Sequence, residues 1–405
     1  MSARGVENTV QEFEAAGTRA GRGTKPYPAH WKNGTGLNLL VLQASPFCNI
    51  DCSYCYLPAR TEKRRMSDEV LAAAFRRVVE SGTVNGPFVV VWHAGEPFAL
   101  PVAWYENAFR IIEEVVPPGI EYRHSFQTNA TLVTPAWCRF LKDRNLDIGV
   151  SVDGPAFLHN ASRKTRAGTG TFAQTMSGID QLQDAGVNFH VITVLTRETL
   201  EFPDELYDFY MENGICQAAF NIDEMEGANR TSSLDFEDAE EAFRRFIARF
   251  WVRVRDDDFR LALREFTDAR EMILNAPDTD VVNHLTAPFN ITTVSVDGGI
   301  STFSPELIGM PSKTYGDFVF GNVLTDSLDA VRRSAKFRQM LDDVIDGVAA
   351  CRQECEYFAV CGGGAPSNKY FENGTFRSTE TQYCRLTKKA VIDLVLAEIE
   401  TALDE

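Results

Sequence analysis

Three cysteines lie close together in the stretch "SPFCNIDCSYCYLP", which follows the apolar run "LNLLVLQA". They are Cys48, Cys52 and Cys55. Thiolates are preferred ligands of zinc and of iron–sulfur clusters. A structural zinc site normally takes four ligands, and His93 is a conceivable fourth, whereas three thiolates on a [4Fe–4S] cube leave one iron open to a small chelating molecule. The spacing therefore favours a cluster with an open iron, with zinc as the alternative.

A second cysteine group occurs in "CRQECEYFAVCGGG" and "QYCRL". Its members are Cys351, Cys355, Cys361 and Cys384. Four thiolates form a closed coordination set, which suits a structural or electron-carrying iron–sulfur cluster rather than an open one. Zinc is the alternative for this group as well.

The composition excludes several classes of protein. Nine cysteines in 405 residues, an odd number without a secretion signal, do not indicate a disulfide framework. Cys138 and Cys216 stand alone, and we expect each to be a small buried hydrophobe. "MSARGVENTV" lacks the order of a signal peptide and the apolar runs are only strand-length, so we expect a cytoplasmic protein that does not span a membrane. A net charge of −17 argues against nucleic acid as a partner, because phosphates would be repelled.

The elements that must position the first cysteines alternate along the chain. Strand-like runs occur at "LNLLVLQA", "FVVVWHA", "EYRHSFQT", "LDIGVSVD", "VNFHVITVL" and "CQAAFNI", and segments with helical periodicity separate them. Such alternation predicts parallel strands joined by right-handed crossovers, as in a partial (β/α)6 TIM-like barrel with its chemistry at the carboxyl ends of the strands. A flat doubly wound sheet is the alternative.

The alternation of strands and helices ends after the sixth strand. A helical segment is expected over Asp235–Leu274, then a β-hairpin turning at Asp297–Gly298–Gly299 and a helix over Ser327–Ile345. We therefore divide the chain into an N-terminal arm (1–37), the barrel (38–234), a helical bridge (235–284) and a smaller domain with the second cysteine group and a C-terminal helix (285–405).

The first motif resembles a known family. Cys-x3-Cys-x2-Cys with Tyr54 before the last cysteine resembles the signature of the radical S-adenosylmethionine (SAM) superfamily. In that family the open iron binds SAM and its cleavage releases a 5′-deoxyadenosyl radical. "WHAGEP" resembles the family's Gly-Gly-Glu-Pro motif, with Ala94 in place of the first glycine. The resemblance implies that Gly95 allows a close backbone approach and that Glu96 accepts from the SAM ammonium.

Two further strand ends carry the same resemblance. "SVDGPAFLHNASR" resembles the segment that holds the ribose and the carboxylate of SAM, which implies those roles for Ser151 and Arg163. Asn129 in "QTNAT" is implied as a further ribose contact. Each piece also has a plain structural interpretation: Glu96 as a carboxylate at a helix start, Asp153 as part of a turn, and Arg163 as a solvated charge.

The C-terminal region resembles the SPASM domain of radical SAM enzymes that modify ribosomally made peptides and proteins. A full SPASM domain holds two auxiliary clusters, but Ser304 and Ala365 stand here where we would place cysteine ligands. The resemblance therefore implies two [4Fe–4S] clusters in all, one binding SAM and one auxiliary.

"VDGGISTFSPELIG", "GDFVFGNV" and "GGGAPSNKYFENGTF" resemble a subgroup that joins an aromatic ring to the β-carbon of a residue two positions onward, a three-residue cyclophane. The implied partners are a precursor peptide and a flavodoxin- or ferredoxin-type electron donor. Glu306 is the candidate base for the ring proton, with Asp223 and Glu224 as alternatives. Rival interpretations are formylglycine formation of the sulfatase-maturase kind, thioether formation, epimerisation and a non-enzymatic iron–sulfur module.

Overall fold

The computed structural model describes residues 36–274, 281 and 283–404. The expected N-terminal arm lies outside these residues except for its last two. Among the described helices none is long and apolar enough to cross a membrane.

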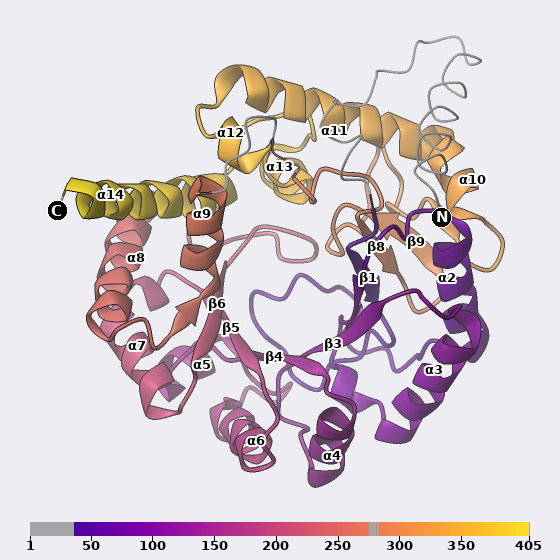
Figure 1. The fold of residues 1–405 in the computed structure, drawn as a ribbon, viewed down its shortest axis with the longest axis horizontal. Helices are drawn as coiled ribbons and strands as arrows, with labels where there is room; N and C mark the ends of the chain where they lie inside the picture. The colour runs from indigo at the N-terminus through magenta and orange to yellow at the C-terminus, as the bar shows by residue number, and fades with distance from the viewer. Residues whose placement is uncertain (1–35, 275–280, 282, 405) are drawn as a thin grey trace.

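Six parallel strands form the centre of the protein, and each falls within a predicted strand-like run. They are β1 (Leu39–Leu42), β2 (Phe88–Trp92), β3 (Tyr122–Thr128), β4 (Asp147–Ser151), β5 (His190–Leu195) and β6 (Gln217–Ile222). They pair in chain order. Because the order never reverses, all the crossovers run the same way and place their helices on one face. Figure 1 shows the strands as an arc with helices outside it, so the partial barrel is confirmed and the flat doubly wound sheet is not found.

The outer helices begin where the sequence carries helix-start residues. They are α2 (Asp68–Glu80), α3 (Val102–Val115), α4 (Pro135–Asp143), α5 (Ala156–Ser162), α6 (Phe172–Asp184) and α7 (Pro203–Glu212). The Ser67 hydroxyl accepts from the Val70 N–H at the start of α2, and the Thr134 hydroxyl accepts from the Trp137 N–H at the start of α4. Each side chain satisfies a backbone donor that the helix cannot pair by itself.

The strands divide their side chains between the two faces of the arc. On β2, Trp92 is fully buried and its ring meets those of Trp104 and Tyr105 of α3 at 5.8 and 5.2 Å. Alternate residues of a strand point to opposite faces. Val89 and Val91, which alternate with the buried residues of β2 and are half-buried, therefore face the inside of the arc.

The sheet continues beyond the six strands. The segment expected to be helical is two helices, α8 (Ala239–Asp256) and α9 (Arg264–Leu274), separated by a short strand, β7 (Ala262–Leu263), which pairs parallel with β6. At the other edge β8 (Ile291–Val294) pairs parallel with β1. The predicted hairpin is confirmed, because β8 pairs antiparallel with β9 (Gly299–Thr302), and β10 (Gly321–Asn322) extends it. The C-terminal strands thus share one ten-stranded sheet with the barrel.

The single helix expected over Ser327–Ile345 is wrong. The structure has α10 (Leu328–Arg333) and α11 (Ala335–Glu354), because Ser334 leaves the helical conformation and its hydroxyl accepts from the Phe337 N–H to begin α11. The remaining elements are α12 (Phe358–Cys361), α13 (Pro366–Asn373), the π-helix η5 (Cys384–Ala390) and α14 (Val391–Asp404). Figure 1 shows α11, α12 and α13 along the side that the arc of strands leaves open.

Candidate functional site

The first three cysteines lie in the loop that follows β1. Cys48 and Cys52 are buried, Cys55 is half-buried, and Ile50 and Tyr54 pack beside them. Burial is the main cause that raises the pKa of Cys48 to about 12 and that of Cys52 to about 11. The charges of the neighbouring thiolates act in the same direction, and Arg163 opposes them at Cys52. Three thiols that oppose one another's ionisation become stable thiolates when a cationic group neutralises them. This donor set fits a three-thiolate iron–sulfur cluster.

The "WHAGEP" segment packs directly on the cysteine loop. Gly95 has a positive φ of 63°, and a Cβ there would lie 2.3 Å from the Phe47 carbonyl oxygen. The Glu96 N–H donates to that same carbonyl at 2.7 Å. Only glycine allows this approach, so Gly95 occurs where the backbone contact requires it. Ala94, with φ at 75°, adopts the same left-handed conformation despite its Cβ.

Glu96 joins the ends of two strands. Its carboxylate accepts from the N–H groups of Phe98 and Asn129 and from the Thr128 hydroxyl at 2.6–2.9 Å. Burial nevertheless raises its pKa to about 7. Glu96 therefore caps the short 3-10 helix η3 (Pro97–Ala99) and fixes the end of β3. The interpretation as a carboxylate at a helix start holds, and one lone pair of Oε2 is left for a further donor.

A buried ion pair connects the ends of β4 and α5. Both Asp153 oxygens accept from Arg163, at 2.9 Å from Nε and 3.1 Å from Nη2, and Asp153 also accepts from the Tyr54 hydroxyl. The remaining nitrogen, Nη1, lies 4.0 Å from the Cys52 sulfur. Arg163 is 6% exposed, so it is not a solvated charge. The sequence interpretation missed the role of Asp153, because it treated this residue as part of a turn.

Asn129 and Ser151 occupy the ends of β3 and β4. The Asn129 amide donates to the Asn49 Oδ1 at 3.0 Å, lies 3.9 Å from the Cys48 sulfur and accepts from Thr131. The Ser151 hydroxyl accepts from Gln127 at 2.8 Å. Asn129 therefore orders the loop beside the cysteines, and Ser151 lies half-buried at the same edge of the sheet.

His93 pairs with a tyrosine of the cysteine loop. Its Nδ1 lies 3.2 Å from the Tyr56 hydroxyl, and the two rings stack with their centroids 6.2 Å apart. Burial lowers the pKa of His93 to about 4, so its imidazole is neutral. The hydrogen bond that the structure gives this ring is to Tyr56 and not to a thiol.

The four C-terminal cysteines come together from three elements. Cys351 lies in α11, Cys361 ends α12 and Cys384 begins η5. After burial, the charges of Cys361 and Cys355 raise the pKa of Cys351, and the charge of Cys361 raises that of Cys384. The mutual influence of these thiols fits a four-thiolate cluster. In the described ranges no group of three or more His, Cys, Asp or Glu side chains is arranged to hold a single metal ion.

A buried lysine lies against this second group. Lys369 of α13 is 2% exposed, and its Nζ donates to the Gly347 carbonyl at 2.9 Å and to the Cys351 sulfur at 3.1 Å. Its charge opposes the effect of burial on the Cys351 pKa. The sequence interpretation missed this residue, although "SNKY" beside a cysteine group offers one cation.

Carboxylates gather between the barrel and the C-terminal domain. Burial raises the pKa of Glu306 to about 7, that of Glu224 to about 8 and that of Glu226 well above its ordinary value. Glu306 accepts from the Ser304 hydroxyl, and Glu224 accepts from the Asn368 amide of α13. After burial, the charges of Glu306 and Glu226 raise the pKa of Tyr56, which places this carboxylate cluster beside the cysteine loop. Glu226 was missed, although "DEMEG" carries it two residues after Glu224.

Other expected residues have structural partners. Asp223 accepts from the Asn229 amide and the Ser233 N–H and so fixes the loop after β6. Ala365 is buried where α13 begins. Cys138 is buried on α4 as expected, but the expectation that Cys216 is buried is wrong: it is exposed just before β6.

Comparisons with known proteins agree with this arrangement. The Radical SAM superfamily matches residues 42–210. The chain is 40% identical over 373 residues to the uncharacterized protein sll1766 of Synechocystis sp., covering 90% of this chain and 93% of that protein. It is 24% identical over 349 residues to the serine-type anaerobic sulfatase-maturating enzyme of Bacteroides thetaiotaomicron, covering 82% and 83%.

Two solved structures share the fold at low sequence identity. Native anSMEcpe with bound AdoMet and Cp18Cys peptide has a TM-score of 0.71 and 22% identity, covering 91% of this chain and 100% of that one. SuiB of Streptococcus suis bound to precursor peptide SuiA has a TM-score of 0.63 and 16% identity, covering 86% and 76%.

Residues 42–210 therefore form a radical SAM domain, and the chain belongs to the same family as the Synechocystis protein. The superfamily implies a [4Fe–4S] cluster and SAM. The C-terminal domain is consistent with that of the solved sulfatase-maturase structure.

Proposed function

We propose that this enzyme is a peptide maturase that joins an aromatic ring carbon to the β-carbon of a residue two positions onward. Cys48, Cys52 and Cys55 would hold the SAM-binding cluster, and Cys351, Cys355, Cys361 and Cys384 an auxiliary one. When bound, these groups supply a 5′-deoxyadenosyl radical and an acceptor for one electron. Tyr54, Gly95, Glu96, Asn129, Ser151 and Arg163 would shape the SAM site.

The observation that carries the proposal is the carboxylate cluster beside the cysteine loop. The peptide loses a hydrogen atom from a β-carbon, the carbon–carbon bond forms to the ring, and the ring then loses one proton and one electron to become aromatic again. The proton needs a base, and a carboxylate whose pKa lies near neutrality is suited to accept it. Glu306 has such a pKa and the Ser304 hydroxyl orients it. We assign Glu306 as that base.

A second candidate is formylglycine formation. It is favoured by the sulfatase-maturating enzymes among the relatives. One observation argues against it. At the two positions where we would place cysteine ligands of a further cluster, Ser304 donates a hydrogen bond to Glu306 and Ala365 is buried.

The test is anaerobic co-expression with a short peptide encoded beside the gene, followed by mass spectrometry. A cyclophane gives a loss of two hydrogens, with no fragment ions between an aromatic residue and the residue two positions onward. Formylglycine instead places the whole change on a single Ser or Cys, and this result would replace the proposal. SAM cleavage to 5′-deoxyadenosine, measured in the same samples, separates an unsuitable peptide from an inactive enzyme.

Two variants test the assigned roles. We expect Cys52→Ala to abolish 5′-deoxyadenosine formation. Glu306→Gln should retain it and lose the cross-link, because hydrogen abstraction does not need the base. An unchanged cross-linking rate in Glu306→Gln would remove Glu306 from this role.

A further inference from the structure

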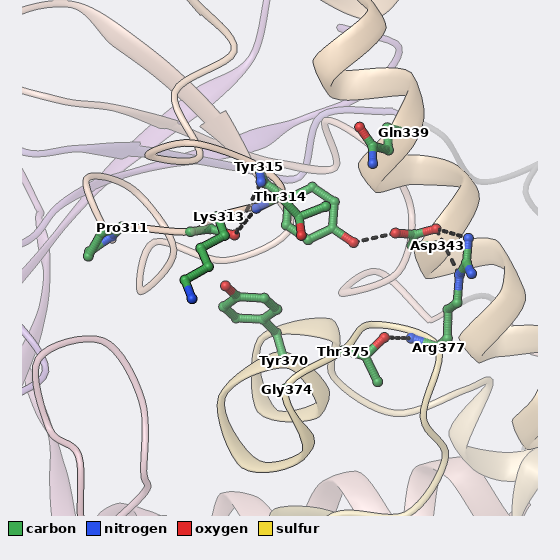
Figure 2. A pocket seen from close by; sticks show the side chains of 11 residues that line it. Pro311, Lys313, Thr314, Tyr315, Gln339, Asp343, Tyr370, Gly374, Thr375 and Arg377 are labelled. Atoms are coloured by element: carbon green, nitrogen blue, oxygen red, sulfur yellow. Dashed lines mark hydrogen bonds and ion pairs between the residues drawn. The ribbon is translucent and has the colours of Figure 1, made fainter.

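A cavity of about 570 Å³ lies in the C-terminal domain, outside the cysteine groups. Its walls come from the segment 311–315, from α11 and from the end of α13 with the turn after it, as Figure 2 shows. This volume is within the range of small-ligand sites and is large enough for one or two amino-acid side chains.

The carboxylate in the wall of the cavity is already paired. Asp343 accepts from the Tyr315 hydroxyl and from Arg377, whose Nε lies 2.9 Å from its Oδ1. Arg377 also contacts Asp346 at 3.5 Å, so two carboxylates balance its charge. Protein donors thus already occupy the Asp343 carboxylate, the one carboxylate among the residues that line the cavity.

Several donors in the wall remain available. The Ser312 oxygen accepts from the N–H groups of Thr314 and Tyr315, and the Thr375 oxygen accepts from the Arg377 N–H, so both hydroxyl hydrogens are free to donate. Lys313 is exposed, and Figure 2 shows its side chain extending into the space beside the Tyr370 ring. Within the part of the chain that the structure describes, no ion pair is recorded for Lys313. A donor-rich wall with one unbalanced cation fits a negatively charged acceptor.

Helix α13 separates this cavity from the carboxylate cluster. Asn368 contacts Glu224, whereas Tyr370 lines the cavity. Residues two apart on a helix project about 200° from each other, across a cylinder about 10 Å wide. An extended peptide rises about 3.3 Å per residue, so at least about three residues are needed to pass from one side to the other.

We propose that this cavity binds an acidic side chain of the peptide substrate, at least about three residues from the residues that react. The inference rests on the proposed function in taking a peptide as the substrate. Binding needs neither SAM cleavage nor a particular product. A failed cross-linking assay therefore leaves the inference standing, and failed binding leaves the cross-link standing.

The experiment uses the anaerobic holoenzyme and three pools of labelled octapeptides, random except for a fixed central Glu, Gln or Lys. We expect the Glu pool to be retained about tenfold more than the Gln pool, which corresponds to ~1.4 kcal/mol. Lys313→Gln should remove this preference. The control is Lys142→Gln, which removes the charge of an exposed lysine on α4. This variant should leave the preference for the Glu pool intact.

Three outcomes would overturn the proposal. They are equal retention of the Glu and Gln pools by the wild type, a preference that survives Lys313→Gln, and a preference lost equally in Lys142→Gln. Inorganic phosphate is a fourth probe, beside the three peptide pools. If phosphate binds in a Lys313-dependent manner while the Glu pool is not retained, the cavity is a small-anion site and not a peptide subsite.

Discussion

Arg163 and Asp153 form a buried ion pair at the end of β4, and Arg163 Nη1 points from that pair toward the Cys52 sulfur at 4.0 Å. Asp153 also accepts from the Tyr54 hydroxyl and from the Val194 N–H. One carboxylate thus ties the cysteine loop, β4 and β5 to the arginine. Two of the three guanidinium nitrogens of Arg163 donate to Asp153, so any role of Arg163 toward SAM depends on this aspartate.

Asp153→Asn should destabilise the protein by about 3 kcal/mol, because it leaves a buried guanidinium without its countercharge. Denaturant unfolding of the anaerobic protein measures the loss. The matched control is Asp147→Asn at the start of β4, where the ion pair with Arg123 at 2.9 Å is exposed and should be worth less than about 1 kcal/mol. Equal losses of stability in the two variants would show that the buried ion pair of Arg163 stabilises the protein no more than the exposed pair of Asp147.

Lys369→Met should lower the reduction potential of the auxiliary cluster proposed for the C-terminal cysteines, because a buried positive charge beside Cys351 favours the more negative, reduced state. We expect a decrease of roughly 60 mV, a tenfold change for one electron. Redox titration followed by electron paramagnetic resonance measures it, with Lys142→Met as the control for a distant lysine. An unchanged potential would mean that the Lys369 charge does not reach the cluster.

Glu226→Gln should stabilise the protein in alkaline but not in acidic solution. Burial and the charges of Glu224 and Glu306 hold the pKa of Glu226 well above its ordinary value in the folded state. A carboxyl with a raised folded pKa destabilises the fold progressively once the pH exceeds its unfolded pKa, about 4.3. The gain should therefore be near zero at about pH 4 and increase steadily as the pH rises above that value.

Thermal unfolding at several pH values measures this gain. The control is Glu241→Gln, which removes a carboxylate from the exposed face of α8 and should show no comparable rise with pH. A gain for Glu226→Gln that is constant across the pH range would contradict the assignment of its raised pKa.

The proposed cross-linking by the wild type should rise with pH through about 7, because Glu306, the base assigned in that proposal, acts only when deprotonated and burial raises its pKa to about 7. The rate of cross-link formation in a single turnover measures this limb. Formation of 5′-deoxyadenosine in the same reactions is the control, since it does not use Glu306. A cross-linking rate that tracks SAM cleavage at every pH would argue against Glu306.

Ala94→Gly should stabilise the protein by ~0.5–1 kcal/mol, because relief of the left-handed strain at Ala94 exceeds the entropy that glycine adds to the unfolded chain. Ala72→Gly, inside α2, should have the opposite sign with a loss of about 1 kcal/mol. Denaturant unfolding of both variants measures the difference. A loss in Ala94→Gly as large as that in Ala72→Gly would show that the positive φ carries no strain.

The sequence by itself determined the barrel and the cysteine groups. Strand and helix periodicity is local, so the runs around Trp92 and Phe126 and the start residues Ser67 and Thr134 predict their elements without knowledge of the rest. Cysteine spacing is equally local. The break at Ser334 escaped prediction because a serine inside a helical pattern has no distinct signal until its hydroxyl is seen to accept from Phe337.

Only the tertiary structure decided which charges meet. Asp153 and Arg163 are ten residues apart, but Glu224 and Asn368 lie 144 residues apart and come together because α13 packs beside the loop after β6. Burial then shifts the pKa values of Glu224, Glu226 and Glu306, and no local pattern encodes burial of a polar side chain. The strand order likewise placed β8 beside β1, which joins both halves of the chain in one sheet. Such contacts depend on how distant segments pack, and the sequence specifies them only through the complete fold.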